Sequence, residues 1–229
     1  MSLFAIADLH LSFGHNKPMD IFRGWNDYAQ RIEKNWRSLI TENDTVVIPG
    51  DISWAMRLNE TIADFSFINS LPGKKIILKG NHDYWWDTKK KMEGFFQEHN
   101  FDTLSILFNC AYMVENYAVC GTRGWFYDAE KDENKKILNR EVGRLKKSIK
   151  DAKKTKLEPI VFLHYPPVYG NNECSEILEI LVENNIKKCY YGHIHGTSSF
   201  KKAVIGEYKG IDFHLVSSDY INFMPVLIR

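Results

Sequence analysis

The chain has 229 residues, of which 44% are apolar and 26% are charged, a balance that predicts one α/β domain spanning residues 1–229 with a single well-filled core. Thirty Lys and Arg residues against 29 Asp and Glu residues leave a net charge of +1. This balance argues against a protein that binds nucleic acid or an anionic membrane by bulk electrostatic attraction, so any affinity for phosphate must come from a local site.

The cysteines and the N-terminus point to a protein of the cytoplasm. No two of the four cysteines form a C-x-x-C pair, and reduced, mostly buried thiols are expected at Cys110, Cys120, Cys174 and Cys189. Residues 1–8 carry no basic segment of the kind that begins a signal peptide. Apolar runs stay well below the roughly 20 residues that a membrane helix needs, so no membrane partner is expected.

Short apolar runs alternate with helical patterns along the chain. Strands are expected at Leu3–Ala7, Thr45–Ile48, Lys75–Lys79, Leu104–Phe108, Ala111–Val114, Tyr117–Cys120, Ile160–Leu163, Lys188–Tyr190, Ala203–Gly206, Ile211–Val216 and Phe223–Leu227. Helices are expected at Tyr28–Ile40, Leu58–Asn69, after the N-cap Thr88, and at Glu173–Asn184. The runs between Leu104 and Cys120 suggest antiparallel pairing. Strands alternating with helices predict a layered α/β domain.

The most charged stretch is Asp128–Lys156, in which eleven Lys and Arg residues surround apolar residues at helical spacing. This pattern predicts a long amphipathic helix whose basic face is exposed to solvent. The alternative is that the basic face over residues 131–156 is a docking surface for a partner.

Polar motifs follow several of the predicted strands directly. They are Asp8-Leu9-His10, Gly50-Asp51, Gly80-Asn81-His82-Asp83, His164, and Gly192-His193-Ile194-His195-Gly196. Because open α/β sheets bind ligands at the carboxyl ends of their strands, we expect these motifs to converge on one crevice.

The side chains in these motifs suit transition metals. Imidazole nitrogens, carboxylate oxygens and one amide oxygen together favour Zn²⁺, Mn²⁺ or iron. Glycines beside the donor residues let the chain turn sharply with no Cβ to crowd a metal cluster. The candidate ligands are Asp8, His10, Asp51, Asn81, His164, His193 and His195. Seven donors are too many for one tetrahedral ion but suffice for two ions that share a carboxylate.

The motifs, in this order between residues 8 and 196, resemble those of the calcineurin-like metallophosphoesterase superfamily. The resemblance implies a four-layer α/β/β/α sandwich, in which two mixed β-sheets are flanked by helices. It also implies two divalent or mixed-valence ions of Mn, Fe or Zn. One ion would be held by Asp8, His10, Asp51 and His195, and the other by Asp51, Asn81, His164 and His193.

The same resemblance implies catalytic roles for His82 and Asp83. His82 would meet the phosphate and protonate the leaving group, while Asp83 would orient the His82 imidazole. The implied activity is metal-dependent hydrolysis of a phosphomonoester or phosphodiester, in which metal-bound hydroxide attacks phosphorus. A small-molecule or nucleotide-like substrate is expected.

One departure from the family pattern narrows this activity. Ser/Thr protein phosphatases of the fold carry Asp-Arg-Gly shortly after the second motif, whereas this chain has Ile52-Ser53-Trp54 after Gly50-Asp51. A protein phosphatase or a nuclease of the same fold is the alternative within enzymes. A non-catalytic metal-binding scaffold is the alternative outside them.

Two further features are candidates for substrate contact. Arg123 lies between two glycines after a predicted strand, where its guanidinium would grip phosphate or join a buried ion pair. Four tryptophans lie near the motifs, and we expect Trp85 and Trp125 among them to stack on a planar leaving group, the alternative being simple packing of the loops.

Overall fold

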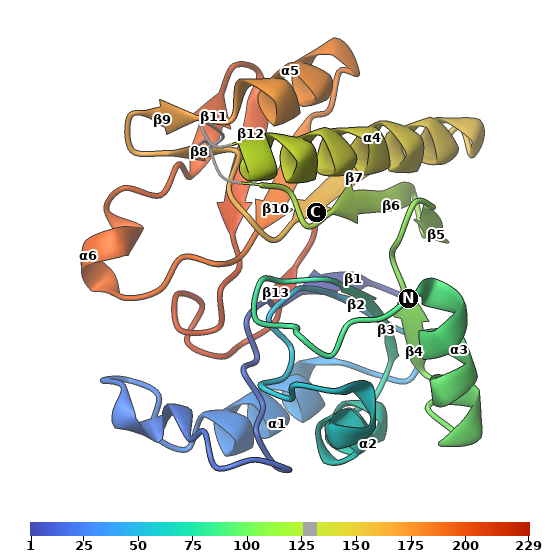
Figure 1. Cartoon of the computed structure of the whole chain (residues 1–229), viewed down its shortest axis with the longest axis vertical. Coiled ribbons are helices and arrows are strands. Elements are labelled where there is room, and N and C mark those ends of the chain that lie inside the picture. Colours follow the sequence, from blue (N-terminus) through green and yellow to red (C-terminus); the bar gives the residue numbers. More distant parts are fainter. Residues whose placement is uncertain (126–131) are drawn as a thin grey trace.

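The computed structural model describes residues 1–125 and 132–229 of the chain (Figure 1). Residues 128–131, which begin the predicted basic helix, lie outside the described residues.

The first sheet has the strand order β13-β1-β2-β3-β4. The strands are β1 (Leu3–Ala5), β2 (Thr45–Pro49), β3 (Lys74–Leu78), β4 (Leu104–Ile106) and β13 (Val226–Leu227). The chain-order neighbours β1 to β4 pair in parallel, and β13 joins the edge of β1 in the antiparallel sense. This sheet is therefore mixed, with its parallel strands ending at one edge.

The second sheet has the order β11-β12-β10-β7-β6-β5. The strands are β5 (Tyr112–Val114), β6 (Tyr117–Thr122), β7 (Glu158–Leu163), β10 (Lys188–Tyr191), β11 (Gly206–Tyr208) and β12 (Ile211–Leu215). The four central strands are parallel, and both edge strands are antiparallel to their neighbours. A short hairpin of β8 (Val168–Tyr169) and β9 (Asn172–Glu173) stands apart.

Helices cover the outer face of each sheet (Figure 1). The helices are α1 (Tyr28–Leu39), α2 (Ile62–Ser70), α3 (Lys89–Glu98), α4 (Asp132–Lys154), α5 (Ser175–Glu183) and α6 (Thr197–Phe200), with 3₁₀ turns η1 (Met19–Ile21) and η2 (Leu58–Thr61). Helices α1, α2 and α3 lie on the first sheet, and α4 and α5 lie on the second. Within the described ranges, each helix is too short or too polar to cross a bilayer.

Alternating side chains of the strands divide the core into layers. In β2, Val46 and Ile48 join the cluster under α1 to α3, while Val47 joins the cluster between the two sheets. In β7, Phe162 faces that same middle cluster, while Val161 packs under α4 and α5. Successive side chains of a strand point to opposite faces, so each central strand is buried on both sides. The predicted four-layer sandwich of two mixed sheets flanked by helices is confirmed.

Two predicted strands differ from the structure, one in pairing direction and one in position. Leu104–Phe108 was expected in antiparallel pairing, but β4 is parallel to β3 because α3 returns the chain to the same end of the sheet. Ala203–Gly206 was expected as a strand, but β11 begins only at Gly206. Its register is set by the two-residue turn at Lys209 and Gly210, which both have positive φ, as a type I′ hairpin requires.

The basic helix and the cysteines agree with their predictions. Helix α4 buries Leu138, Leu145 and Ile149 against the second sheet, while most of its Lys side chains are exposed. All four cysteines are free thiols, and three of them are buried.

Candidate metal centre

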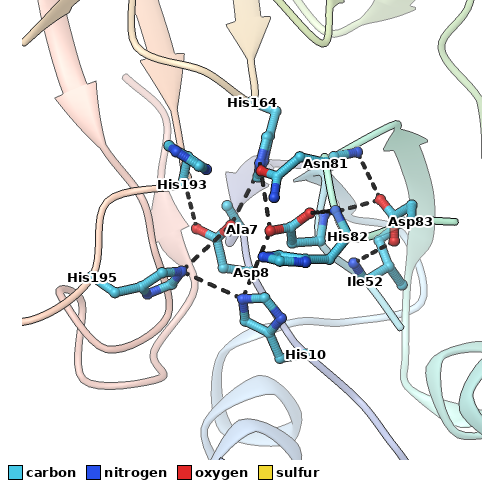
Figure 2. Close-up of polar contacts among 12 residues, drawn as sticks. Ala7, Asp8, His10, Ile52, Asn81, His82, Asp83, His164, His193 and His195 are labelled. Atoms are coloured by element: carbon cyan, nitrogen blue, oxygen red, sulfur yellow. Dashed lines mark hydrogen bonds and ion pairs between the residues drawn. The ribbon is translucent and has the colours of Figure 1, made fainter. Parts of the chain in front are cut away.

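The seven predicted donor residues come together where parallel strands of both sheets end (Figure 2). Asp8 and His10 follow β1, Asp51 follows β2, Asn81 follows β3, His164 follows β7, and His193 and His195 follow β10. The second sheet contributes three imidazoles, and the first contributes both carboxylates. Because these loops leave two facing sheets, residues separated by nearly 190 positions in the sequence lie side by side.

The donor atoms form two groups. Asp8, His10 and His195 make one group, and Asp51, His164 and His193 make the other, with the donor atoms of each group within 4.8 Å of one another. Asp51 lies between the groups, since its Oδ2 is 3.8 Å from His10 Nε2 and 3.5 Å from His164 Nε2. The Asp51 carboxylate therefore faces both groups at once.

The loops that present these donors adopt an unusual backbone conformation. Asp8, His10, Asp51 and His193 have φ of 60°, 46°, 51° and 73°, in the left-handed region that residues with a side chain rarely adopt. Such conformations persist when the surrounding structure enforces them, and they cluster at functional sites. Here each one turns a donor side chain away from the path of its strand and toward the centre.

Glycines make room for two of the carboxylates. A Cβ on Gly80 would lie 2.1 Å from Asp51 Oδ1, and a Cβ on Gly192 would lie 2.7 Å from Asp8 Oδ2. Both distances are shorter than any real contact of a Cβ atom, so any larger residue would displace the carboxylate. The expectation that these glycines make space for the donors agrees with the geometry.

The surroundings of His164 fix its ring so that Nε2 faces the other donor atoms of the site. The ring is buried, which lowers its pKa to about 3, so it is neutral and carries one N–H. Nδ1 lies 3.0 Å from the Pro49 carbonyl and donates to it, which leaves Nε2 as an acceptor 2.7 Å from Asn81 Oδ1. Two acceptors at this separation repel unless a cation lies between them, as for two ligands of one ion.

Asp219, which is not among the residues predicted for the site, orients His195 in the same way. Asp219 Oδ1 accepts from His195 Nδ1 at 2.8 Å, and its Oδ2 accepts from the Gly196 backbone N–H at 3.0 Å. His195 Nε2 therefore points at the first donor group, 3.4 Å from His10 Nε2. Asp219 follows strand β12, and its place after a predicted strand is a sequence signal that it shares with many ordinary turns.

The electrostatics of the centre fit two cations. Asp8 Oδ1 is buried without a hydrogen-bond partner among the described residues, and burial raises the Asp8 pKa to about 7. Burial also lowers the pKa of His193 to about 2, which keeps its ring neutral and able to coordinate. A buried carboxylate oxygen without a hydrogen bond and neutral imidazoles are the groups that a metal ion stabilises, so the residues present fit a two-metal centre.

His82 lies beside the donor groups rather than within them. Its backbone N–H donates to Asp51 Oδ1 at 2.8 Å, and its ring centroid is 5.7 Å from that of His10. The ring packs on Trp54, at a centroid distance of 4.5 Å, and Trp54 also stacks on His10 at 4.9 Å. His82 Nδ1 is buried and has no hydrogen-bond partner among the described residues.

The predicted orienting role of Asp83 is wrong. Its buried carboxylate accepts from the backbone N–H groups of Gly80, Asp51 and Ile52 at 2.7, 3.0 and 2.9 Å. These hydrogen bonds hold together the loops after β2 and β3, and none of them reaches the His82 imidazole. The reason is geometric: the turn directs neighbouring side chains apart, with Asp83 inward and His82 toward the donor groups (Figure 2). Asp83 is thus a loop-organising residue.

The expectation for Trp85 is also wrong. Trp85 is 2% exposed, donates its indole N–H to Asp83 Oδ1 at 3.2 Å and packs edge-on against Phe65. A ring enclosed in the core cannot stack on a substrate. Trp125 is half-buried, 5.6 Å in centroid distance from Tyr165, and its predicted contact with substrate remains a prediction.

Arg123 lies next to the centre and has a loose ion pair. Its Nη2 is 3.6 Å from Oε1 of the buried Glu141, its guanidinium stacks on Trp125 at 4.7 Å, and its Nε has no hydrogen-bond partner among the described residues. Its carbonyl accepts from the His164 backbone N–H at 3.1 Å. Arg123 therefore has the predicted ion pair, with Glu141, and its Nε is a donor without a partner among the described residues. The predicted contact of Arg123 with phosphate stays a prediction.

Comparisons with solved structures show the fold. A protein of unknown function from Aquifex aeolicus is 15% identical with a TM-score of 0.51, and the match covers 99% of this chain and 95% of that one. A phosphopantetheinyl hydrolase from Mycobacterium tuberculosis is 13% identical with a TM-score of 0.56, again over 99% of this chain and 95% of that one.

Comparisons of sequence show the family. The Gene 66 protein of Mycobacterium phage L5 is 35% identical over 80 residues, which are 34% of this chain and only 37% of that relative's length. A model of the family described as calcineurin-like phosphoesterase matches residues 1–197, a stretch that contains every one of the seven donor residues. The chain therefore belongs to the calcineurin-like phosphoesterases and is a metal-dependent hydrolase of phosphoric esters.

Proposed function

We propose that this chain hydrolyses a small-molecule or nucleotide-like phosphomonoester or phosphodiester with two transition-metal ions of Mn, Fe or Zn. The observation that supports this most directly is the pair of donor groups with the Asp51 carboxylate between them. The net charge of the chain is only +1, which favours a compact substrate over a long polyanionic polymer. The free thiols favour work in a reducing compartment, the cytoplasm.

The seven donors divide between the two ions. Asp8, His10 and His195 would hold one ion, Asn81, His164 and His193 the other, and Asp51 would belong to both. When bound, the ions supply an activated water at neutral pH and stabilise the negative phosphoryl oxygens. Pro49 and Asp219 hold the imidazoles of His164 and His195 with Nε2 toward the metals.

His82 is the proposed proton donor to the leaving group. Its backbone is tied to Asp51, and its ring is held by Trp54 rather than by a carboxylate. This arrangement places a half-buried imidazole beside the proposed metal ligands, and its Nδ1 has no hydrogen-bond partner among the described residues. An alkoxide leaving group needs a proton, and a protonated imidazole (imidazolium) is the natural donor near neutral pH, becoming neutral imidazole as the proton leaves.

The test is a substrate panel on protein first stripped of metal with a chelator. Chromogenic monoesters and diesters are assayed after adding Mn²⁺, Zn²⁺, Fe²⁺ or Mg²⁺ in turn, together with a phosphopantetheinyl diester because a structure of the same fold is named for that chemistry. We expect hydrolysis only with a transition metal. Asp51→Asn, prepared in parallel, should be inactive with every metal. Hydrolysis that survives chelation, or none with any ester and metal, would contradict the proposal.

A further inference from the structure

A cavity of about 410 Å³ lies beside the metal centre, between the loops after β3 and β6 and the helices α3 and α4. Its lining is rich in cations but contains only two carboxylates. The charged residues are Lys79, Lys89, Arg123 and Arg144, with Asp87 and Glu141. The formal charges of these residues give the lining of the cavity a net positive charge, although the whole chain is close to neutral.

The two carboxylates do not neutralise this cavity. Glu141 is buried and shared, since it pairs closely with Arg144 and is 3.6 Å from Arg123. Asp87 is engaged by Lys91. Lys79 forms no hydrogen bond or salt bridge with any residue in the described ranges, and Arg123 Nε is buried there without a partner. Donors and positive charge are therefore left for something that enters the cavity.

The cavity adjoins the proposed reaction centre through two of these cations. Lys79 directly precedes Gly80-Asn81, so its side chain starts two residues from a proposed metal ligand. The Arg123 carbonyl accepts from the backbone N–H of His164, another proposed ligand. These two backbone links place the cavity next to the proposed reaction centre.

The two guanidinium groups are held in place by aromatic rings. Arg123 lies over Trp125 at 4.7 Å, and Arg144 lies over Phe108 at 5.0 Å. Stacking of this kind fixes the plane of the guanidinium, whose fork of N–H groups matches phosphate oxygens. Because the Lys and Arg donors are held around one space, an oxyanion with several oxygens fits them better than an apolar group does.

We propose that this cavity binds a second phosphoryl group of the substrate, so that the natural substrate is a phosphoric ester carrying another phosphate. The inference rests on the proposed function, because it names the substrate class for the same reaction centre. The scissile phosphate would lie at the metals, and the second phosphate would lie among Lys79, Arg123 and Arg144.

The kinetic test uses matched substrates on the metal-loaded protein. Thymidine 3′-(p-nitrophenyl phosphate) is compared with the same diester bearing a 5′-phosphate, and adenosine 3′-phosphate with adenosine 3′,5′-bisphosphate. In at least one of the two pairs, we expect kcat/KM to be at least about tenfold higher for the doubly phosphorylated ester than for its partner, because the second phosphate gains charge-assisted hydrogen bonds. Lys79→Met should bring that ratio close to one, and Lys79→Arg should restore it.

Arg140→Gln is the matched control, because Arg140 is exposed on α4 and does not line the cavity. It removes the same charge from the same helix that carries Arg144, and it should leave the ratio unchanged. A wild-type ratio near one, or a ratio that Lys79→Met does not change, would overturn the proposal.

A binding test separates this inference from the proposed function. Metal-free protein is titrated with inorganic phosphate by calorimetry, so that the metals contribute nothing to binding. Wild type and Arg140→Gln should bind, and Lys79→Met should bind at least about tenfold more weakly. If no ester is hydrolysed, the proposed function fails and this titration alone decides about the cavity, with equal binding by all three proteins counting against it. Phosphate binding without any preference among substrates would mean a site for free phosphate and would overturn the substrate assignment.

Discussion

The His82 ring packs on Trp54 and not on a carboxylate. This arrangement predicts how removing the side chain affects metal binding and catalysis. His82→Ala should keep both metals, because none of the seven donor side chains is altered, and should lower kcat by about 10²–10⁴, the usual contribution of a positioned acid. The loss should be smaller for a p-nitrophenyl ester than for an alkyl ester, because p-nitrophenolate leaves without a proton. Steady-state kinetics on both esters, with metal content measured on the same samples, check this.

Two outcomes would change the role of His82. Equal losses on both esters would mean that His82 only binds phosphate. Loss of metal together with activity would mean that it belongs to the ligands.

Asp219 should act on the metals through His195. Asp219→Asn keeps the size of the side chain but weakens the hydrogen bond that directs His195 Nε2 inward. Removing such a partner typically costs about 10–100-fold in metal affinity, and we expect that loss for the ion held by His195. Competition with a chelator of known affinity measures it. Asp212→Asn is the matched control, because Asp212 pairs with His214 at 2.9 Å on the surface, and an equal loss there would argue against positioning.

At the scale of residues, the sequence was informative where a motif follows a strand. The convergence of the seven candidate donors could be predicted because each lies just after an apolar run. The roles of Asp83 and Trp85 could not, because a turn decides which neighbour points inward and which outward. Asp219 could not be singled out either, since one carboxylate after one strand is an ordinary turn signal.

At the scale of elements, buried strands and amphipathic helices were predictable because their periodicity is local. The predictions that failed concerned the pairing direction of one strand and the first residue of another. The direction of β4 depends on the crossover through α3, and the start of β11 depends on a turn at Lys209 and Gly210 that requires positive φ. Both are set by geometry beyond the segment itself.

Two glycines, one in a helix and one in the loop after β3, should respond in opposite ways to substitution by alanine. Gly143 lies in α4 and a Cβ there would contact nothing within 4 Å, so Gly143→Ala should stabilise the protein by about 0.5–1 kcal/mol. Gly80→Ala places a Cβ against Asp51 Oδ1 and should remove metal binding and activity. Denaturant unfolding and metal analysis of both variants check this. Full metal binding by Gly80→Ala would show that the Asp51 loop adapts.

At the scale of the whole molecule, metal binding should be linked to protons. Burial raises the Asp8 pKa to about 7, and although burial opposes the charge on His195, Asp8 and Asp219 raise its pKa to about 9. Both groups therefore hold protons in the metal-free protein that a metal must displace. Metal affinity should fall as the pH drops from 9 to 6, and adding Mn²⁺ at pH 7 in weak buffer should release protons. Affinity that is constant over this range would contradict the linkage.

The central claim is that one chain holds two ions joined by a single carboxylate, and metal content measures it most directly. After reconstitution with Mn²⁺ and removal of free metal, elemental analysis should give two ions per chain for the wild type. Asp51→Asn should lose both ions together, because both donor groups share that carboxylate. One ion or none per chain in the reconstituted wild type, or an Asp51→Asn variant that keeps two, would contradict the account.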